Sequence, residues 1–190
     1  MSKVSKWIKP VDKETPVKES DVLVTKTDKF GNIIYGNKKF FKVTKLDEAQ
    51  AIGEPHNINR HPDMPKAIFH LLWKTIKRGK NFRGIVKNMT MDGKYYWVIT
   101  DFEMKKAEDG DMEYYMAYRR GIPQKAKEEI EKIYKEMKSI EATDGMRASL
   151  KHLENILADK GISYNDFVEN LLKESDRTRS MMGKIKSLFN

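Results

Sequence analysis

The side chains that could do chemistry in this 190-residue chain are few, and one type is missing altogether. There is no cysteine, which excludes disulfides, cysteine-ligated zinc and iron–sulfur sites, a cysteine nucleophile and the addition of a cysteine to a flavin. The four histidines, His56, His61, His70 and His152, have no paired metal-binding spacing, so we expect no metal site. No general base is paired with a nucleophile in a known motif, and we expect no catalytic residue and no enzyme activity.

Polar residues and two histidines gather between residues 55 and 67, and two further candidates, Trp73 and Asn88, follow. Several of them have an ordinary structural explanation. Asp63 would cap the helix that follows it, and Arg60 would be its ion-pair partner on the surface. His61 would be a packed core histidine, and Trp73 a core residue at helical spacing. Residue types alone therefore leave both a structural and a ligand-binding role open.

The chain is basic, but its lysines are scattered. It carries 37 Lys and Arg against 28 Asp and Glu, a formal net charge of +9. Only Lys38, Lys39, Lys42 and Lys45 form a local cluster, whereas a phosphate-binding surface needs clustered basic charge. The sequence has no helix-turn-helix pattern with a basic recognition face. We therefore expect a solvated lysine-rich surface and no nucleic-acid partner.

The predicted elements follow the order strand, strand, several helices, three strands and then helices. Strands are predicted at residues 22–25, 33–35, 82–91, 94–104 and 112–119, short helices at 37–43 and 46–52, and a longer helix after Pro65. The last three strands are joined by Asp-Gly turns, which are strong hairpin signals. This order predicts an α+β fold: a five-stranded antiparallel sheet with helices on one face. The hollow between sheet and helices would suit a flat ligand.

The two ends of the chain differ from its middle. Residues 1–20 are polar, so we expect a loosely held N-terminal leader. After Pro123, apolar residues from Ala126 to Ile140 repeat with the spacing of a heptad, and Ser163–Asp166 resembles a capping box. Residues 123–190 therefore form a predicted helical segment. Two heptads do not make a stable coiled coil, so we expect these helices to lean on each other or on the sheet.

Residues 22–120 resemble a PAS sensory domain, most closely the PAS domain of aerotaxis and energy-taxis receptors. The strings that carry the resemblance are PHNINRHPDMPKA from Pro55 to Ala67, then Trp73, then GIVKN from Gly84 to Asn88, then Asp92-Gly93 and Tyr96–Val98. The first string is long and unusual in composition, which makes it specific. The resemblance covers about half of the chain. Together with the composition of the two ends it predicts three parts: the leader 1–20, a PAS domain over 21–122 and a C-terminal helical output or dimerisation segment over 123–190.

That family is known to sense redox or oxygen status with non-covalently bound FAD, so the resemblance implies the PAS fold, this cofactor and this role here. It implies that Arg60, His61 and Asp63 lie at or near a flavin pocket and that Trp73 and Asn88 help to hold the cofactor. A guanidinium or imidazolium there would stabilise a reduced, anionic flavin. The Asn88 amide offers both a donor and an acceptor, and Trp73 could stack on the flavin or its adenine.

The sequence also departs from the family. Phe82 stands where family members often carry a second tryptophan, and Met89–Met91 follow Asn88 where basic residues are common. Either change could alter the affinity for the cofactor or its identity.

The resemblance also bears on localisation and partners. The sequence has no membrane anchor, HAMP-like segment or long glutamine-rich signalling hairpin, so we expect a cytoplasmic protein without a membrane span. It would report to a separate membrane chemoreceptor or another signalling protein, and its C-terminal helices could form a homodimer. Two alternatives remain. One is a haem-binding gas sensor with His56 or His61 as axial ligand. The other is a ligand-free interaction module whose cavity is filled by aromatic side chains.

Overall fold

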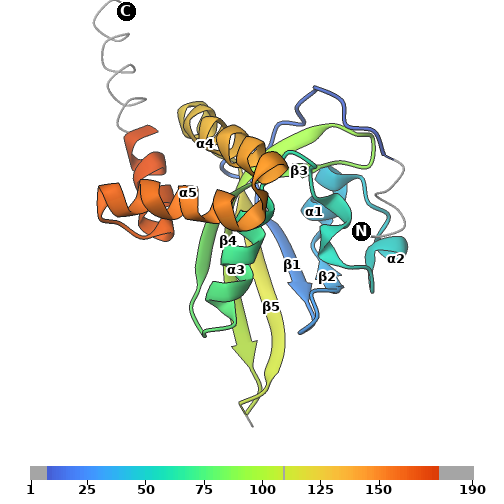
Figure 1. Ribbon diagram of the computed structural model, residues 1–190. Helices are drawn as coiled ribbons and strands as arrows, with labels where there is room; N and C mark the ends of the chain where they lie inside the picture. The colour runs from blue at the N-terminus through green and yellow to red at the C-terminus, as the bar shows by residue number, and fades with distance from the viewer. Residues whose placement is uncertain (1–7, 109, 176–190) are drawn as a thin grey trace, which may run out of the picture.

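The computed structural model describes residues 8–108 and 110–175, and its centre is one antiparallel sheet (Figure 1). The strands are β1 (Leu23–Thr27), β2 (Ile33–Gly36), β3 (Phe82–Met89), β4 (Tyr95–Lys106) and β5 (Met112–Arg120). They lie in the order β2-β1-β5-β4-β3. Residues 1–7 of the expected leader, Asp109 and residues 176–190 of the expected helical segment lie outside the described residues.

The β3–β4 hairpin forms where Asp92-Gly93 predicted it. Met89 pairs with Tyr95, and the register continues without a shift to Phe82 opposite Phe102. Gly93 has a φ of 82°, a conformation that glycine adopts at little cost. The hairpin therefore fixes which residues of β3 and β4 lie opposite each other.

Helices between β2 and β3 cover one face of the sheet, as predicted, and the α+β architecture expected from the sequence is confirmed. They are α1 (Lys38–Thr44), α2 (Glu48–Ala51), the 3-10 helix η2 (His56–Asn59) and α3 (Lys66–Ile76). Asn37 caps α1, because its side chain accepts a hydrogen bond from the amide of Phe40. The predicted cap of α3 is wrong: α3 begins after Pro65, and the Glu141 carboxylate from a distant helix accepts the amide hydrogen of Ala67 at 2.9 Å.

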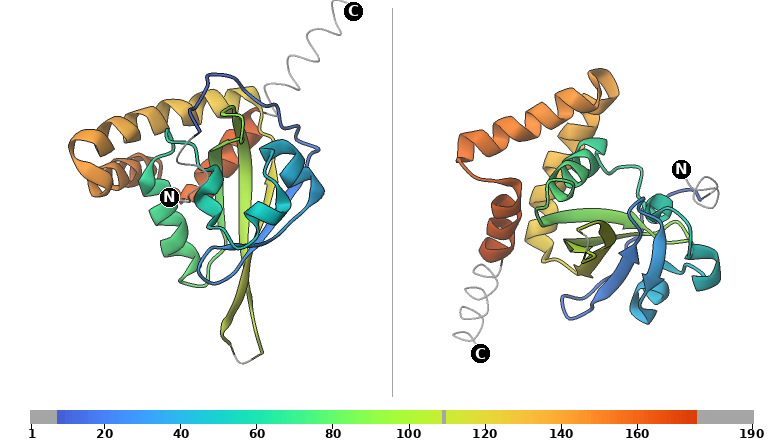
Figure 2. Two further views of the ribbon diagram at one scale, coloured as in Figure 1. Left: turned by 90° about the vertical axis from the view of Figure 1, so that its right-hand side faces the viewer. Right: turned by 90° about the horizontal axis from the view of Figure 1, so that it is seen from below.

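The C-terminal helices pack on each other and on the sheet, as we expected from their short heptad pattern. They are α4 (Gln124–Thr143), α5 (Gly145–Lys160) and residues 164–175. Tyr96 and Trp97 point to opposite faces of β4, as neighbours in a strand do. Trp97 stacks on Tyr134 of α4, with ring centroids 6.2 Å apart, so α4 lies on the face away from α3. Figure 2 shows these helices gathered at the β3 side of the sheet, with β2, α1 and α2 at the other side.

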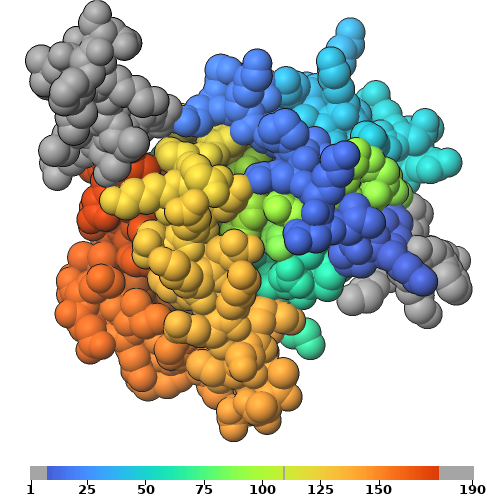
Figure 3. All heavy atoms as spheres, turned by 90° about the horizontal axis from the view of Figure 1, so that it is seen from above, coloured from blue at the N-terminus to red at the C-terminus, as the bar shows by residue number. Residues whose placement is uncertain are grey.

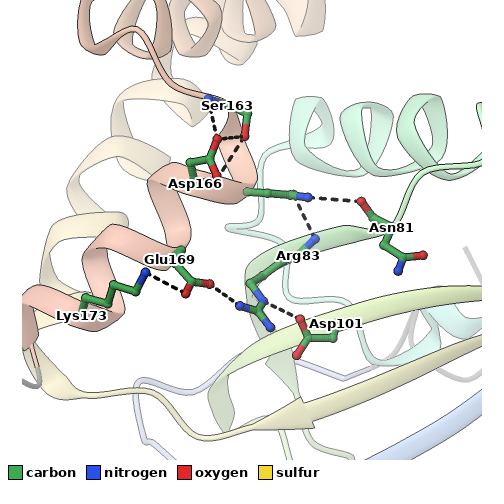
Figure 4. A network of polar contacts seen from close by, with 8 residues as sticks. Asn81, Arg83, Asp101, Ser163, Asp166, Glu169 and Lys173 are labelled. Carbon is green, nitrogen blue, oxygen red and sulfur yellow. Dashed lines mark hydrogen bonds and ion pairs between the residues drawn. The ribbon is translucent and has the colours of Figure 1, made fainter.

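The outer edge of β3 is covered by side chains of the C-terminal helices. The Asn165 side chain accepts from the amide of Arg83 and donates to the carbonyl of Asn81, and the Tyr134 hydroxyl donates to the carbonyl of Ile85 at 2.7 Å. Figure 4 shows Arg83 between Asp101 and Glu169, two carboxylates that it pairs with. The unpaired backbone groups of an exposed strand edge can pair with another chain. Here side chains of the C-terminal helices bind the Arg83 amide and the carbonyls of Asn81 and Ile85.

The capping box predicted at Ser163–Asp166 is confirmed. The amide of Asp166 donates to Ser163 Oγ at 3.2 Å, and the amide of Ser163 donates to Asp166 Oδ2 at 3.3 Å. This reciprocal pair starts the helix that carries Glu169 toward Arg83.

The prediction of a loosely held leader is wrong for its described part. The amides of Val11 and Thr15 donate to the carbonyls of Gly93 and Tyr95, at 2.9 and 2.7 Å. Glu14 forms an ion pair with Lys127 of α4 at 2.7 Å. Figure 3 shows this segment (dark blue) against the β3–β4 region (green) and beside α4 (yellow). Residues 8–20 thus add to the fold as an extended strap, because the β3–β4 turn leaves backbone groups to pair with.

Candidate functional site

A cavity of about 360 Å³ lies between α3 and the covered face of the sheet. It falls within the range of small-molecule sites, about 300–1,000 Å³. Helix α3 supplies Phe69, Leu72, Trp73 and Ile76 to its wall, because residues at i, i+3, i+4 and i+7 share one helix face. Val86, Phe102 and Tyr115 come from the sheet. The cavity is therefore walled mainly by apolar and aromatic side chains.

Trp73 is fixed from two sides. Its ring meets Tyr115 edge to face, with centroids 5.6 Å apart. On the other side Gly31 approaches so closely that a Cβ there would lie 3.3 Å from the Trp73 ring. Gly31 also has a φ of 88°, which disfavours any other residue. The turn before β2 and helix α3 therefore hold the indole in one place in the cavity wall.

A polar cluster stands beside this apolar wall. Asn88 and Tyr96 are cross-strand partners, and the buried Tyr96 hydroxyl is hydrogen-bonded by Asn59 Nδ2 at 3.0 Å and by the Asn88 side chain. Burial raises the pKa of Tyr96 to about 12, so the hydroxyl stays neutral. The cavity thus has an amide, Asn88, whose orientation is set by a buried phenol.

Arg60 lines the cavity and is partly exposed, so we describe its position as the rim of the cavity. Its Nη2 donates to the carbonyl of Met64 at 2.9 Å, and its guanidinium lies 4.2 Å from the centre of the Phe69 ring. Burial lowers its pKa, and the Glu141 carboxylate partly opposes this. Arg60 forms no ion pair with Asp63, which was the structural alternative suggested by the sequence. It is instead the β-bridge partner of Asn88.

The sequence reasoning missed Arg119, the most enclosed charge of the site. Arg119 is 3% exposed and lines the cavity. Its Nη1 donates to Thr25 Oγ1 at 2.8 Å, and its Nη2 lies 3.0 Å from His56 Nε2. Burial lowers the pKa of Arg119 to about 10, so it remains a cation at neutral pH. One signal was available: Tyr115, Ala117 and Arg119 are alternate residues of one strand, so the arginine occupies an inward position.

His56 is neutral because of its surroundings. Burial, followed by the positive charge of Arg119, lowers its pKa to about 3. Its Nε2 therefore serves as an acceptor for Arg119. The histidine holds the guanidinium in place without cancelling its charge.

Thr100 completes the polar side of the cavity. It is the cross-strand partner of Arg119 and lines the cavity. Its hydroxyl is buried and has no hydrogen-bond partner among the described residues, and such groups in native proteins usually have one. A buried cation and an unsatisfied hydroxyl side by side fit a ligand that presents acceptor atoms.

The structure brings three of the five expected site residues to this cavity, namely Arg60, Trp73 and Asn88. His61 and Asp63 are not in its lining. Asp63 lies on the other side of β3, where it pairs with Lys87 at 2.8 Å and shares a separate cavity of about 270 Å³ with Trp97. Lys87 and Asn88 point to opposite faces because they are neighbours in a strand. A cofactor role of the five residues remains a prediction.

His61 is a buried histidine packed edge to face on Tyr95, with centroids 6.2 Å apart. Burial and then the Lys87 charge lower its pKa to about 4, against the opposing effect of Asp63. Its ring is therefore neutral at neutral pH, and it does not supply the imidazolium considered in the sequence analysis.

Among the residues described, no helix is both long enough and apolar enough to cross a membrane.

Comparisons with known proteins agree with this geometry. Residues 33–119 match a family model described as the PAS fold. The aerotaxis receptor of Escherichia coli (strain K12) is 35% identical over 121 residues, or 64% of this chain and 24% of the receptor. The nitrogen fixation regulatory protein of Klebsiella oxytoca is 30% identical over 108 residues, or 57% of this chain and 22% of that protein. The matched region is thus about a quarter of the length of these relatives.

Solved structures with the same fold include two light-oxygen-voltage domains. One, studied with a flavin analogue, gives a TM-score of 0.54 at 15% identity and covers 60% of this chain and 86% of that chain. The dark structure of the photoreceptor Aureochrome1 LOV gives 0.52 at 16% identity, with coverages of 63% and 86%. At these identities the likeness concerns the fold.

Proposed function

Since residues 33–119 form a PAS domain of the aerotaxis-receptor type, we propose that this chain is a signalling sensor that holds FAD in the α3 cavity without a covalent bond. The observation that carries the proposal is the composition of the cavity: an aromatic wall at Trp73, an oriented amide at Asn88 and a buried cation at Arg119. An aromatic wall can stack on a flat heteroaromatic ring, and an amide and a guanidinium can hydrogen-bond its polar edge. The cofactor itself would supply reversible electron uptake.

The residues of the chain have separate tasks in this proposal. Trp73 and the apolar face of α3 cover the flat side of the ring and exclude water. Asn88 donates and accepts at the polar edge of the ring, and Tyr96 holds the amide in orientation. A cavity of about 360 Å³ suits a tricyclic ring better than a whole dinucleotide. The adenosine part would therefore extend past the rim at Arg60.

The route from the cavity to the C-terminal helices runs through α3. Arg60 binds the carbonyl of Met64 just before α3, and Glu141 of α4 accepts the first-turn amide of Ala67. A shift of α3 would change the contact with α4, which is how a change at the ligand would reach residues 123–190. A membrane chemoreceptor or another signalling protein is the proposed partner, a cytoplasmic location the proposed setting, and a homodimer through the C-terminal helices the proposed assembly.

Nothing in the geometry favours the two alternatives. For haem, an axial histidine needs a free ring nitrogen facing the cavity, whereas His56 Nε2 is engaged by Arg119 and Thr25, and His61 does not line the cavity. For a ligand-free module, aromatic side chains would have to fill the interior, and the cavity measures about 360 Å³.

The visible spectrum of the purified protein, before and after dithionite, tests the proposal. A yellow flavin band that bleaches on reduction supports it. A Soret band would instead show that the protein is a haem-binding sensor. A colourless protein that added FAD cannot reconstitute would show that it is a ligand-free interaction module.

A further inference from the structure

Among the residues that the structure describes, no carboxylate pairs with the buried guanidinium of Arg119. Its hydrogen bonds go to neutral acceptors, namely the Thr25 hydroxyl, the His56 ring and the Ala117 carbonyl. None of the ion pairs among residues 8–108 and 110–175 includes it. A buried ion is costly unless an opposite charge accompanies it. Here the cavity is where such a charge would be placed.

We propose that Arg119 binds the atoms of the ligand ring that carry negative charge, and that it thereby sets the redox potential of the bound flavin. This inference rests on the proposed function. A neutral flavin ring that took up two electrons and only one proton would carry one negative charge. A cation beside that charge stabilises the reduced form over the oxidised one and raises the potential.

The geometry assigns this task to Arg119 and not to Arg60. The Arg60 guanidinium is held at the rim by Met64 and the face of Phe69. Arg119 also lines the cavity and is only 3% exposed, and low polarity strengthens electrostatic effects around a buried group. Thr25 and His56 fix its direction from one side, and Thr100 stands opposite it across β4 and β5 with an unsatisfied hydroxyl. Thr25 and His56 are positioning residues, and Thr100 is a second contact for the same ring atoms.

The experiment compares the midpoint potential of the flavin-loaded full chain in four proteins: wild type, Arg119→Gln, Thr25→Asp and Arg60→Gln. Arg119→Gln removes the charge and keeps an amide that can bond Thr25. Thr25→Asp leaves Arg119 in place and supplies a carboxylate at a position now 2.8 Å from the guanidinium. In both variants the equilibrium constant for flavin reduction should fall at least tenfold, which lowers a two-electron midpoint potential by about 30 mV. Arg60→Gln should change the potential by less than half of that.

Thr25→Asp also keeps the inference testable if Arg119→Gln does not fold. Because it pairs a lone buried charge, it should raise the unfolding temperature of the flavin-free protein above that of the wild type. If the wild type binds flavin but the flavin potential of Arg119→Gln or of Thr25→Asp equals that of the wild type, this inference is overturned and the proposed function stands. A wild type that neither holds nor takes up flavin overturns both.

Discussion

Arg60 and Asn88 are β-bridge partners, so the segment after η2 runs antiparallel to the end of β3. This one contact joins the two strings of sequence that carry the family resemblance, around residues 55–67 and 84–88. The amide of Lys87 also points to this segment, donating to Met64 Sδ at 3.2 Å. The bridge therefore fixes Arg60, at the rim of the cavity, next to Asn88 at its polar end.

Removing the amide of Asn88 should lower flavin retention while the fold survives. Asn88→Ala deletes the donor and acceptor at the polar end of the cavity and leaves Tyr96 bonded to Asn59, so the loss of stability should stay near 1 kcal/mol. Arg60→Ala should act in the same direction by opening the rim. Flavin-to-protein absorbance ratios after gel filtration measure retention. The exposed residue His70 on α3 gives the control His70→Ala, and full flavin occupancy in both test variants would remove Asn88 and Arg60 from the site.

Gly31 and Gly53 form a matched pair that isolates the contact with Trp73. Both have a positive φ, 88° and 87°, so replacement by alanine should cost each about 1–2 kcal/mol of stability. Only at Gly31 would the new Cβ meet the Trp73 ring, at 3.3 Å, whereas Gly53 has nothing within 4 Å. Urea unfolding measures the shared cost.

Flavin retention and tryptophan fluorescence should then separate the two glycine variants. We expect Gly31→Ala to change both, because it displaces the indole in the cavity wall, and Gly53→Ala to change neither. Equal flavin retention in the two variants would argue against Trp73 as part of the site.

The paired hydroxyls of Tyr134 and Tyr164 should couple the C-terminal helices to β3. Their oxygens are 2.6 Å apart, and Tyr134 also donates to Ile85. Tyr134→Phe leaves the buried carbonyl of Ile85 and the hydroxyl of Tyr164 short of a partner, at a cost of about 1–3 kcal/mol. In a double-mutant cycle, Tyr164→Phe should cost clearly less in the Tyr134→Phe background than in the wild type. Additive losses in urea would show that the two hydroxyls do not interact.

Mild acid should destabilise the protein through the partly buried His56 and the buried His61. The folded-state pKa values of His56 and His61 are lowered to about 3 and about 4, against about 6.5 for an unfolded histidine. Between these values the unfolded chain binds protons that the folded chain does not, so stability is full above pH 6.5 and falls as the pH drops toward 4.

At pH 5 each of these histidines should cost about 1–2 kcal/mol relative to pH 7.5. Urea midpoints at the two pH values measure the loss. His56→Gln and His61→Gln should each make the midpoint less dependent on pH. The hydrogen bond from Lys45 holds the pKa of Asp92 well below its usual range, so this carboxyl stays ionised between pH 5 and pH 7.5 and does not contribute. A midpoint that is the same at pH 7.5 and pH 5 would contradict this account.

Local signals in the sequence determined much of the fold. The Asp92-Gly93 turn, the capping box at Ser163 and the helix after Pro65 all appear in the structure where their patterns predicted them. Each depends on residues a few positions apart, so the chain carries the information within one element. Trp73 and Asn88 became site candidates through the family resemblance, since residue types alone left a structural and a ligand-binding role open.

Tertiary structure alone decided which charges share a space. Asp63 was expected at the start of α3, but it pairs with Lys87 across the sheet from the cavity, and Glu141 takes its place at the helix end. Strand alternation puts Arg119 at an inward position, but it does not show which groups surround the charge there. Its role follows only from where β1 and η2 bring Thr25 and His56. The free energy of a charge depends on its surroundings in space, and neighbours in space can be far apart along the chain.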